Sequence, residues 1–328
     1  MATWKIYQGN TSPRNDWTLP PAPTWRDFKD DDAGAVARED RKGENFEPPD
    51  VAIKMVNAAI CLRRPLLITG DPGTGKSTLA YSVARELELG KVLKWSITTR
   101  TLLKDGLYSY DAIARVQDAQ TEEKDNRKQV GDYITLGALG TAFLPTDKPR
   151  VLLIDEIDKS DIDLPNDLLN LFEEGEFAIP ELQRLSSSLH YVNSYDREIT
   201  GDNKGKPKKA GIFNGFVRCR AFPLVIMTSN GERDFPPPFL RRCLRLKMPS
   251  PDLLKLGKIV TKHFNAETSD KAEKLIESFF DSRASGTLAT DQLLNAIHMR
   301  LQENFSDDSE LDDVLKRLLQ SLSSAEDE

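Results

Sequence analysis

The segment Gly70-Asp-Pro-Gly-Thr-Gly-Lys-Ser77 decides the fold, because its spacing G-x-x-x-x-G-K-[ST] is that of a phosphate-binding loop. It lies between a short apolar run that predicts a strand and a segment in which Leu79, Val83 and Leu87 recur at helical spacing. Its glycines allow the backbone to fold with N–H groups pointing inward, and the following helix N-terminus adds positive partial charge. The alternative is a glycine-rich turn that arose by chance. Such a turn would not need a strand before it and a helix after it, so we expect a phosphate-binding site.

Each residue of this loop has an expected role. Lys76 should reach the β and γ phosphates of a nucleotide, and the Ser77 hydroxyl should ligate Mg²⁺. The other residues that we expect to hold the nucleotide are Asp71, Pro72, Gly73, Thr74, Gly75 and Thr78.

Two carboxylates end a second apolar run, Val151-Leu-Leu-Ile-Asp155-Glu156. Asp155 is expected to hold Mg²⁺ through its water shell, and Glu156 to polarise the water that attacks the γ phosphate. Alone, the run also fits a buried strand followed by an acidic loop. Together with the phosphate loop, it favours a catalytic pair. Asp158 is interpreted as a solvated or capping residue.

Polar residues also follow a third apolar run, Leu224–Thr228. In a parallel sheet Asn230 would lie at the same edge as Asp155, where it can orient water or sense the γ phosphate. An ordinary Asn-Gly turn is the alternative. Arg241 and Arg242 precede the next strand and can point into a neighbouring subunit's phosphate site, unless they are simply surface arginines.

Five apolar runs separated by helical stretches predict an α/β fold with a mainly parallel five-stranded sheet. The runs are 65–69, 92–97, 151–154, 224–228 and 244–248. After Met248 only helical patterns follow, with Ser250, Thr290 and Ser309 as expected caps. A small all-helical domain therefore follows the sheet.

The predicted organisation has three parts. An N-terminal extension covers 1–45, the α/β core covers 46–248, and the helical lid domain covers 249–328. Polar or charged segments near 104–132 and 184–211 are interpreted as insertions into the core.

The extension carries Trp4, Trp17 and Trp25, although aromatic residues are depleted in disordered tails. We expect an arm held to the body by these rings, either as a stabilising strap or as a docking arm for a partner.

Composition excludes several functional classes. The chain has 328 residues and a net charge of −7, which argues against broad nucleic-acid binding. No apolar run is long enough for a membrane span, and the opening residues lack a secretion signal, so a cytoplasmic protein without membrane contact is expected. Cys61, Cys219 and Cys243 have neither metal-ligand nor disulfide spacing.

The ordered motifs resemble AAA+ ATPases, and among them the MoxR-like branch. The resemblance runs from about Phe46 to the C-terminus and includes the phosphate loop and the segments 152–159, 168–177, 225–230 and 236–243. The segment Leu103–Ile113 resembles the insertion that this branch carries after its second strand. Adjacent Asp-Glu pairs occur in other classes, but the signatures of transporters, helicases and GTPases are absent from this sequence.

The resemblance implies a P-loop AAA+ core whose ATP and Mg²⁺ lie between the core and a helical lid. It implies a homo-oligomer in the form of a hexameric ring, with an arginine acting in trans. Arg242 best matches that arginine, with Arg241 close behind. It also implies a chaperone-like activity that remodels a protein client, such as a von Willebrand factor A-type partner, whereas nucleic acid is not an expected partner.

One departure from the family pattern keeps an alternative open. The lid arginine has no clear match, because Thr290-Asp-Gln-Leu293 places an aspartate there, and Arg283 or Arg300 would have to substitute. The chain is therefore either an ATP-driven remodeller or a nucleotide-gated switch in a defence or signalling complex, with slow turnover.

Two further segments have open interpretations. The cluster Lys204–Lys209, close to Phe213 and Phe216, fits a solvated loop, a contact for an acidic peptide, or a single-stranded nucleic-acid contact in a less favoured nucleic-acid motor. Leu107, Tyr108, Tyr110 and Ile113 form either a client-contacting patch or the small core of the first insertion.

Overall fold

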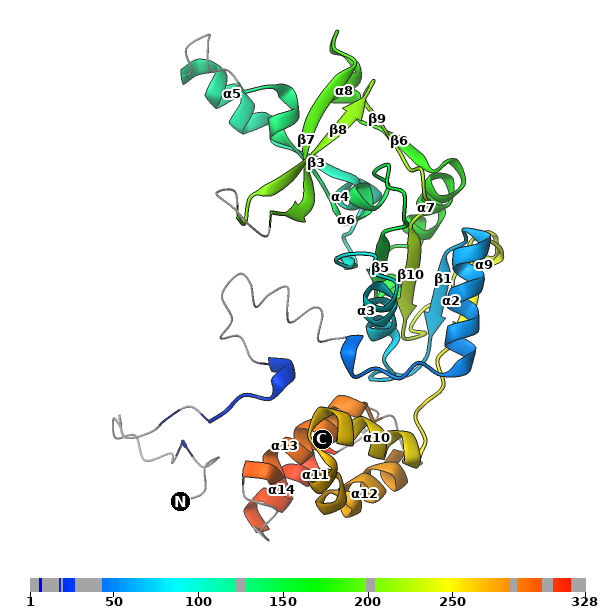
Figure 1. Ribbon diagram of the computed structural model, residues 1–328, viewed down its shortest axis with the longest axis vertical. Coiled ribbons are helices and arrows are strands. Elements are labelled where there is room, and N and C mark those ends of the chain that lie inside the picture. Colours follow the sequence, from blue (N-terminus) through cyan, green and yellow to red (C-terminus); the bar gives the residue numbers. More distant parts are fainter. Residues whose placement is uncertain are drawn as a thin grey trace. The chain divides into compact units, whose positions relative to one another are not determined.

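The computed structural model describes residues 6–7, 18, 20–26, 43–121, 128–198, 204–283, 288–302 and 309–319 (Figure 1). Trp4, Trp17 and most of the predicted N-terminal extension lie outside the described residues. The chain forms two compact units, which we describe separately. The α/β unit comprises 32–69 and 76–248, and the helical unit comprises 1–31, 70–75 and 249–328.

A five-stranded sheet organises the α/β unit, in the order β11-β1-β10-β5-β2. Its strands are β1 (Leu66–Thr69), β2 (Leu93–Ser96), β5 (Val151–Asp155), β10 (Leu224–Ser229) and β11 (Leu244–Lys247). Every neighbouring pair is parallel. The predicted α/β fold with a five-stranded parallel sheet is therefore confirmed.

The central strands β1, β5 and β10 are buried on both faces, which explains why they are almost continuous apolar runs. Val151 and Leu153 of β5 pack into a core that includes α2 (Asp50–Leu62) and α3 (Lys76–Glu86). Leu152 and Ile154 point into a second core with α6 (Ala138–Ala142) and α7 (Asp163–Glu174). Successive residues of one strand therefore anchor opposite layers and fix the strand's exit at Asp155.

A second, six-stranded sheet in the order β3-β4-β7-β8-β9-β6 was not predicted. Its strands are β3 (Tyr108–Tyr110), β4 (Ile134–Leu136), β6 (Glu176–Ala178), β7 (Leu189–Arg197), β8 (Pro207–Phe213) and β9 (Phe216–Arg218). The segment near 184–211, expected to be a polar insertion, contains most of the β7–β8 antiparallel pair. His190 and Val192 are buried whereas Tyr191 is exposed, so only every second residue of β7 is inward.

Short helices complete the α/β unit. They are α4 (Leu103–Leu107), α5 (Ala112–Thr121), η3 (Val130–Tyr133), η4 (Ile157–Lys159), α8 (Pro180–Gln183) and α9 (Pro237–Arg242). The first insertion contributes its own core, because Tyr108 is buried and Leu107 and Tyr110 pack against the same cluster. Ile113 is 73% exposed, so of the four residues whose role was open it alone faces solvent.

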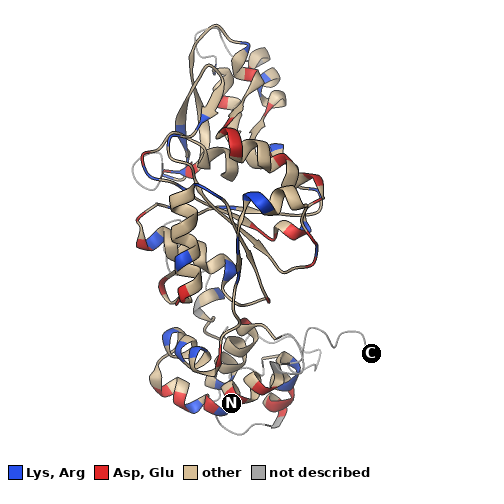
Figure 2. Ribbon diagram, turned by 90° about the vertical axis from the view of Figure 1, so that its right-hand side faces the viewer, with Lys and Arg blue, Asp and Glu red and all other residues tan. Residues whose placement is uncertain are grey.

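The helical unit contains α10 (Leu253–His263), α11 (Ala266–Lys271), α12 (Glu273–Arg283), α13 (Thr290–Gln302) and α14 (Ser309–Leu318), together with η1 (Thr24–Arg26). Its core includes Leu256, Phe279 and Leu293. Figure 2 shows both signs of charge along these helices, as expected for helix faces in contact with water. The helical character predicted after Met248 is observed, although the α11 and α12 segments were not foreseen.

The three predicted helix starts differ in detail, and Ser309 is the first helical residue of α14 rather than the residue before it. Asp252 rather than Ser250 caps α10, since its carboxylate accepts a hydrogen bond from Lys255 N. Thr290 is the first helical residue of α13, and the preceding Ala289 N–H donates to the Gln292 side chain. Helix caps have several compatible side chains within a few positions, so sequence locates them only to within a residue or two.

Trp25 supports the idea of a strap within the helical unit. Its ring meets those of His263, Phe264 and His298 edge-on, at centroid distances of 5.8, 6.0 and 6.1 Å. Burial lowers the pKa of His263, because its surroundings disfavour the charged ring.

The described residues contain no helix that is both long and apolar enough to cross a bilayer. They also contain no cluster of three or more His, Cys, Asp or Glu side chains arranged to hold a metal ion.

Candidate functional site

Asp155, the last residue of β5, lies at the centre of a hydrogen-bonded cluster in the α/β unit. Its Oδ1 accepts hydrogen bonds from Ser77 Oγ at 2.6 Å and Thr228 Oγ1 at 2.8 Å. Its Oδ2 forms an ion pair with Lys94 Nζ at 2.6 Å. The cluster forms because β5 lies between β10 and β2 in the sheet, while Ser77 is on the helix that covers this face.

The cluster keeps Asp155 ionised. Burial acts to raise the pKa of Asp155, but hydrogen bonds from Lys94, Ser77 and Thr228 outweigh it and hold that pKa below its usual value. An ionised carboxylate beside a serine hydroxyl provides the hard oxygen atoms that Mg²⁺ prefers. The residue types expected to bind the metal are therefore adjacent, and their chemistry fits it.

Glu156 has an unusual backbone conformation. With φ at 61° and ψ at 49° it is left-handed, which costs a non-glycine residue about 1–3 kcal/mol. Its N–H donates to Thr228 Oγ1 at 2.9 Å, and its carboxylate pairs with Lys159 Nζ at 2.7 Å. The side chain is 45% exposed, so water can reach the carboxylate. The strained turn separates the two carboxylates: Asp155 is held inward and Glu156 remains accessible.

Three residues of this cluster were missed from sequence. Thr228 bridges Asp155 and Glu156, Lys94 neutralises Asp155, and Lys159 neutralises Glu156. Lys94 did leave a signal, because it is a single charge within an otherwise apolar run. Thr228 and Lys159 could not be assigned to the site from sequence, because their contacts depend on which strands are neighbours and on how the chain turns after Glu156.

Asn230 directly follows β10, at the sheet edge where it was expected. Its backbone N–H donates to Asp158 Oδ2 at 2.8 Å, and Ser229 Oγ donates to the same oxygen at 3.0 Å. Asp158 is only 3% exposed, so it acts as a capping residue for the turn and is not solvated. Gly231 has φ at 82°, so an Asn-Gly turn is also present. The turn and the edge position are compatible, because Asp158 fixes the backbone of Asn230.

The phosphate loop divides between the two units. Gly70–Gly75 belong to the helical unit, while Lys76 and Ser77 begin α3 in the α/β unit. The Lys76 side chain is largely buried, at 7% exposure. Thr78 follows within α3. The contact between Ser77 and Asp155 thus lies wholly within the α/β unit.

Residues 70–75 of the loop contact Ser250 and Thr290, which lie in the same helical unit. Thr74 Oγ1 donates to the Asp71 carbonyl at 2.9 Å, and Ser250 Oγ donates to Asp71 Oδ2 at 2.8 Å. Gly73 has φ at 75°, and a Cβ atom there would lie 2.5 Å from Thr290 N. Conformation and space both require glycine at this position. Pro72 and Gly75 complete the loop, and Gly75 is also left-handed, with φ at 86°.

The two arginines end α9. Arg64 holds this end of the helix, donating to the carbonyl oxygens of Arg241 at 2.5 Å and Arg242 at 3.1 Å. The Arg242 side chain forms an ion pair with Glu173 of the same chain. The Arg241 side chain is exposed and has no hydrogen-bond partner within the described ranges. Both arginines therefore lie at the same surface. The Arg242 side chain is held by Glu173, whereas the Arg241 side chain has no such contact within the described ranges.

Comparison with known proteins gives one family match. Residues 65–243 match the family described as AAA domain (dynein-related subfamily). Among solved structures, NtrX from Brucella abortus in complex with ADP is similar, with 15% sequence identity and a TM-score of 0.41. The similarity covers 84% of this chain and 56% of that chain, so this chain spans little more than half of that protein. No curated protein matches.

Proposed function

Because this chain belongs to the AAA domain family of the dynein-related subfamily, an AAA+ ATPase family, we propose that it binds ATP with Mg²⁺ and hydrolyses it to ADP and phosphate. The observation that carries the proposal is the 2.6 Å hydrogen bond between Ser77 and Asp155. It joins the end of the phosphate loop to the acidic strand end, as a metal–triphosphate site requires.

Each group of residues at the site would have its own role in binding or hydrolysing ATP. The backbone of Asp71–Gly75 would surround the phosphates, with Lys76 and Thr78 completing the loop. Ser77 and Asp155 would hold Mg²⁺, which when bound offsets the charge of the phosphates. Glu156 would accept a proton from the water that attacks the γ phosphorus, while the bond to the β–γ bridging oxygen breaks. Asn230 would orient that water at the sheet edge.

We further propose that the chain belongs to the MoxR-like branch, assembles into a hexameric ring and acts on a protein client such as a von Willebrand factor A-type protein. The motif order and the insertion at Leu103–Ile113 support the branch. The surface position of Arg241 and Arg242 on α9 supports a phosphate contact in trans, with Arg242 the first candidate. A cytoplasmic location is proposed on the sequence alone.

A nucleotide-gated switch with slow turnover is the second candidate. Thr290, and not an arginine, lies next to Gly73 of the phosphate loop. Arg300 forms an ion pair with Asp312 within the helical unit, and the Arg283 side chain lies outside the described residues. These contacts favour a lid that senses nucleotide weakly.

ATP turnover by wild type and Glu156→Gln tests the proposal. We expect Glu156→Gln to bind a fluorescent ATP analogue with unchanged affinity and to lose at least about a hundredfold in turnover. Glu174→Gln, the same change at an exposed position of α7, is the matched control and should behave as wild type. Turnover by Glu156→Gln at the wild-type rate would show that Glu156 is not the base. Sustained turnover by wild type without any partner would argue against the switch.

A further inference from the structure

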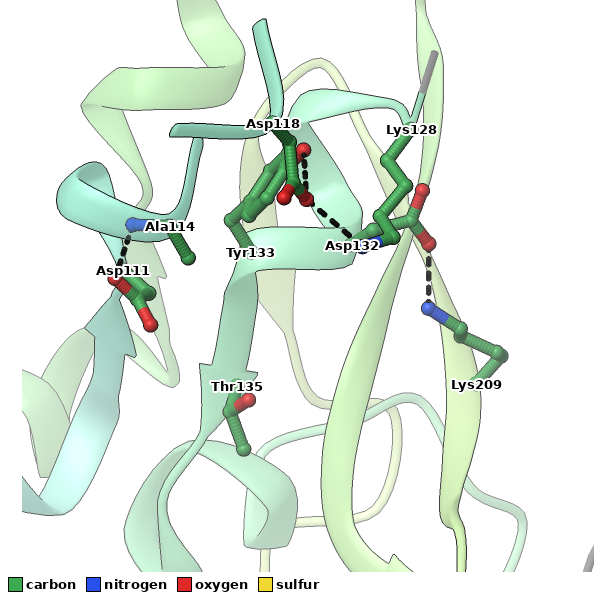
Figure 3. A pocket seen from close by; sticks show the side chains of 8 residues that line it. All are labelled: Asp111, Ala114, Asp118, Lys128, Asp132, Tyr133, Thr135 and Lys209. Atoms are coloured by element: carbon green, nitrogen blue, oxygen red, sulfur yellow. Dashed lines mark hydrogen bonds and ion pairs between the residues drawn. The ribbon is translucent and has the colours of Figure 1, made fainter. Parts of the chain in front are cut away.

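The Arg64 side chain joins the end of α2 to the end of α9 without an ion pair. Other cations of the α/β unit pair with a carboxylate, as Lys209 does with Asp132 at 2.7 Å in the pocket of Figure 3. Arg64 forms no ion pair with any residue that the structure describes. Its Nε donates to Arg242 O at 3.1 Å, and its Nη2 donates to Arg241 O at 2.5 Å. Both bonds go to main-chain oxygens, so Arg64 fixes backbone and does not neutralise a charge.

The helix that receives these bonds has few of its own. α9 has six residues, and the first two are prolines, which have no N–H to donate. The N–H groups of Phe239 and Leu240 both donate to Pro236 O, at 3.0 and 3.1 Å. The last carbonyl groups of a helix have no intrahelical partner, and a helix this short is not stable by itself. Contacts outside α9 therefore decide where Arg241 and Arg242 lie.

A guanidinium group is suited to holding such a helix end. It is planar, and its Nε and Nη2 lie along one edge, so two N–H bonds from that edge fix both the position and the rotation of the acceptors. In this structure the acceptors are consecutive carbonyl groups. The partial negative charge at a helix C-terminus also favours a cation there. A lysine would supply the charge but not the paired donors.

Arg64 is itself held by the ends of two elements. Its N–H donates to Ala59 O in the last turn of α2 at 3.2 Å, and the preceding Arg63 is left-handed, with φ at 53°. The carbonyl of the following Pro65 accepts a hydrogen bond from Leu244 N at 2.8 Å, where β1 and β11 begin to pair. The backbone on both sides of Arg64 is therefore fixed, which makes its side chain a preorganised support.

The segment that carries the two arginines lies between two other anchors. Phe239, in the middle of α9, is fully buried, and its ring packs against Phe235 with the ring centroids 5.5 Å apart. Leu244 begins β11, which pairs with β1. Residues 241–243 connect these anchors, and Arg64 supplies side-chain donors to this connection. All of these contacts lie within the α/β unit.

We propose that Arg64 is a positioning residue for the arginine that contacts a neighbouring subunit's phosphates. By fixing the carbonyl groups of residues 241 and 242, it sets the point from which either arginine side chain leaves the backbone. A displacement of about 1 Å can cost an enzyme about a hundredfold in rate. This inference rests on the proposed function, because it concerns the arginine in trans of that same site. Arg64 precedes β1 and the phosphate loop follows β1, so nucleotide binding by its own subunit should be unaffected.

Replacement of Arg64 and of its neighbour separates this role from a general effect of charge. We expect Arg64→Gln to bind a fluorescent ATP analogue as wild type does and to lose at least about tenfold in turnover. Arg64→Lys keeps the charge and should recover only part of the turnover. Arg63→Gln is the matched control, because the Arg63 side chain is exposed and donates to Ile60 O of its own helix at 2.9 Å. It should turn over ATP as wild type does.

Mixed assemblies show in which subunit the loss occurs. Arg64→Gln keeps an intact phosphate loop, whereas Lys76→Ala keeps an intact arginine pair, so mixing the two should give more turnover than the sum of the separate variants. A subunit that had lost activity by misfolding would not give this recovery. Combining Arg64→Gln with the arginine replacement that abolishes turnover should cause little further loss, because both changes affect one step.

Hydrogen exchange measures the support of α9 without nucleotide. The amides of residues 239–244 should exchange faster in Arg64→Gln than in wild type or in Arg63→Gln, because the end of α9 would open more often. Arg64→Lys provides the same measurements if Arg64→Gln does not fold.

Three results would overturn the proposal. Unchanged exchange in the Arg64 variants would show that Arg64 does not hold α9, and full turnover in Arg64→Gln would show that the arginines do not depend on it. Recovery in mixtures that contain Arg242→Ala, but not in those that contain Arg64→Gln, would place the effect inside the same subunit. Absence of ATP turnover in wild type would contradict the proposed function, whereas the exchange result would still decide whether Arg64 holds α9.

Discussion

Ser77 and Asp155 are 78 positions apart in the chain, yet their side chains meet at 2.6 Å. The contact exists because α3 begins at Lys76 and packs on the sheet face to which Asp155 belongs. A hydroxyl and a carboxylate brought together by separate elements, with a lysine on the other carboxylate oxygen, form a compact polar site at a sheet edge. The following predictions test what this site does.

If Ser77 and Asp155 hold Mg²⁺ as proposed, replacing either residue should make nucleotide binding independent of Mg²⁺. In Ser77→Ala and Asp155→Asn we expect ATP affinity in the presence of Mg²⁺ to fall at least about tenfold, to near the value measured with chelator. Isothermal titration with a slowly hydrolysed ATP analogue, with and without Mg²⁺, measures this. Asp161→Asn, an exposed carboxyl near η4, is the control. A full Mg²⁺ response in Asp155→Asn would exclude Asp155 from the metal site.

The ion pair between Lys94 and Asp155 should lower the pH at which the α/β unit unfolds in acid. The folded pKa of Asp155 lies below its unfolded value, so Asp155 adds stability above about pH 4, and this is lost as pH falls through the lower folded value. Lys94→Met removes the first of the contacts that lower this pKa. We therefore expect a smaller free energy of unfolding near neutral pH and acid unfolding at a higher pH.

Urea denaturation across a pH series measures that shift, with Lys258→Met as a control for loss of an exposed lysine. In Asp155→Asn the further change Lys94→Met should have little additional effect on the pH dependence. Identical pH profiles for wild type and Lys94→Met would show that the ion pair does not stabilise the folded state.

The Thr228 hydroxyl should support both carboxylates. Thr228→Val keeps the shape of the side chain but leaves the Glu156 N–H without its acceptor and removes a donor from Asp155. Leaving a buried polar group unsatisfied costs about 1–3 kcal/mol, and we expect that loss in the free energy of unfolding, with a fall in turnover. Thr228→Ser retains the hydroxyl and should recover most of both. Equal losses in the valine and serine variants would assign the effect to packing.

Much of this site was predictable from the sequence, because two of its parts are local patterns. The loop Gly70–Ser77 and the run ending at Asp155 and Glu156 each carry their chemistry in adjacent residues. Lys94 and Thr228 join the site only through strand order, which places β2 and β10 on either side of β5. Sequence spacing contains no direct record of that order.

The second sheet was missed for a related reason. In β7 and β8 the inward residues alternate with exposed ones such as Tyr191 and Lys209, so no continuous apolar run marks the strands. The central strands of the first sheet, β1, β5 and β10, are buried on both faces and were found because they are almost continuous apolar runs. Alternation interrupted by lysines and glycines instead suggested a polar insertion.

Backbone strain at Glu156 predicts a stability difference between two variants that lack its carboxylate. Both Glu156→Ala and Glu156→Gly lack the carboxylate, but only glycine adopts φ near 61° without a steric penalty. We expect Glu156→Gly to have a free energy of unfolding about 1 kcal/mol greater than Glu156→Ala. Thermal and urea unfolding of the pair measure it. A more stable alanine variant would mean that the residue relaxes out of the left-handed region.

Variants of Arg242 and Arg241 test whether one of these arginines contacts the phosphates of a neighbouring subunit or only stabilises its own chain. If Arg242 contacts a neighbour's phosphates, Arg242→Ala should bind ATP normally but lose turnover, and mixing it with Lys76→Ala subunits should restore some activity. Its ion pair with Glu173 is half-exposed and should contribute little to stability, so Glu173→Ala should keep full turnover. The readouts are turnover of mixed assemblies and unfolding of each variant. Equal turnover by Arg242→Ala and wild type, with loss in Arg241→Ala, would transfer the role to Arg241. No recovery in any mixture would count against an arginine acting between subunits.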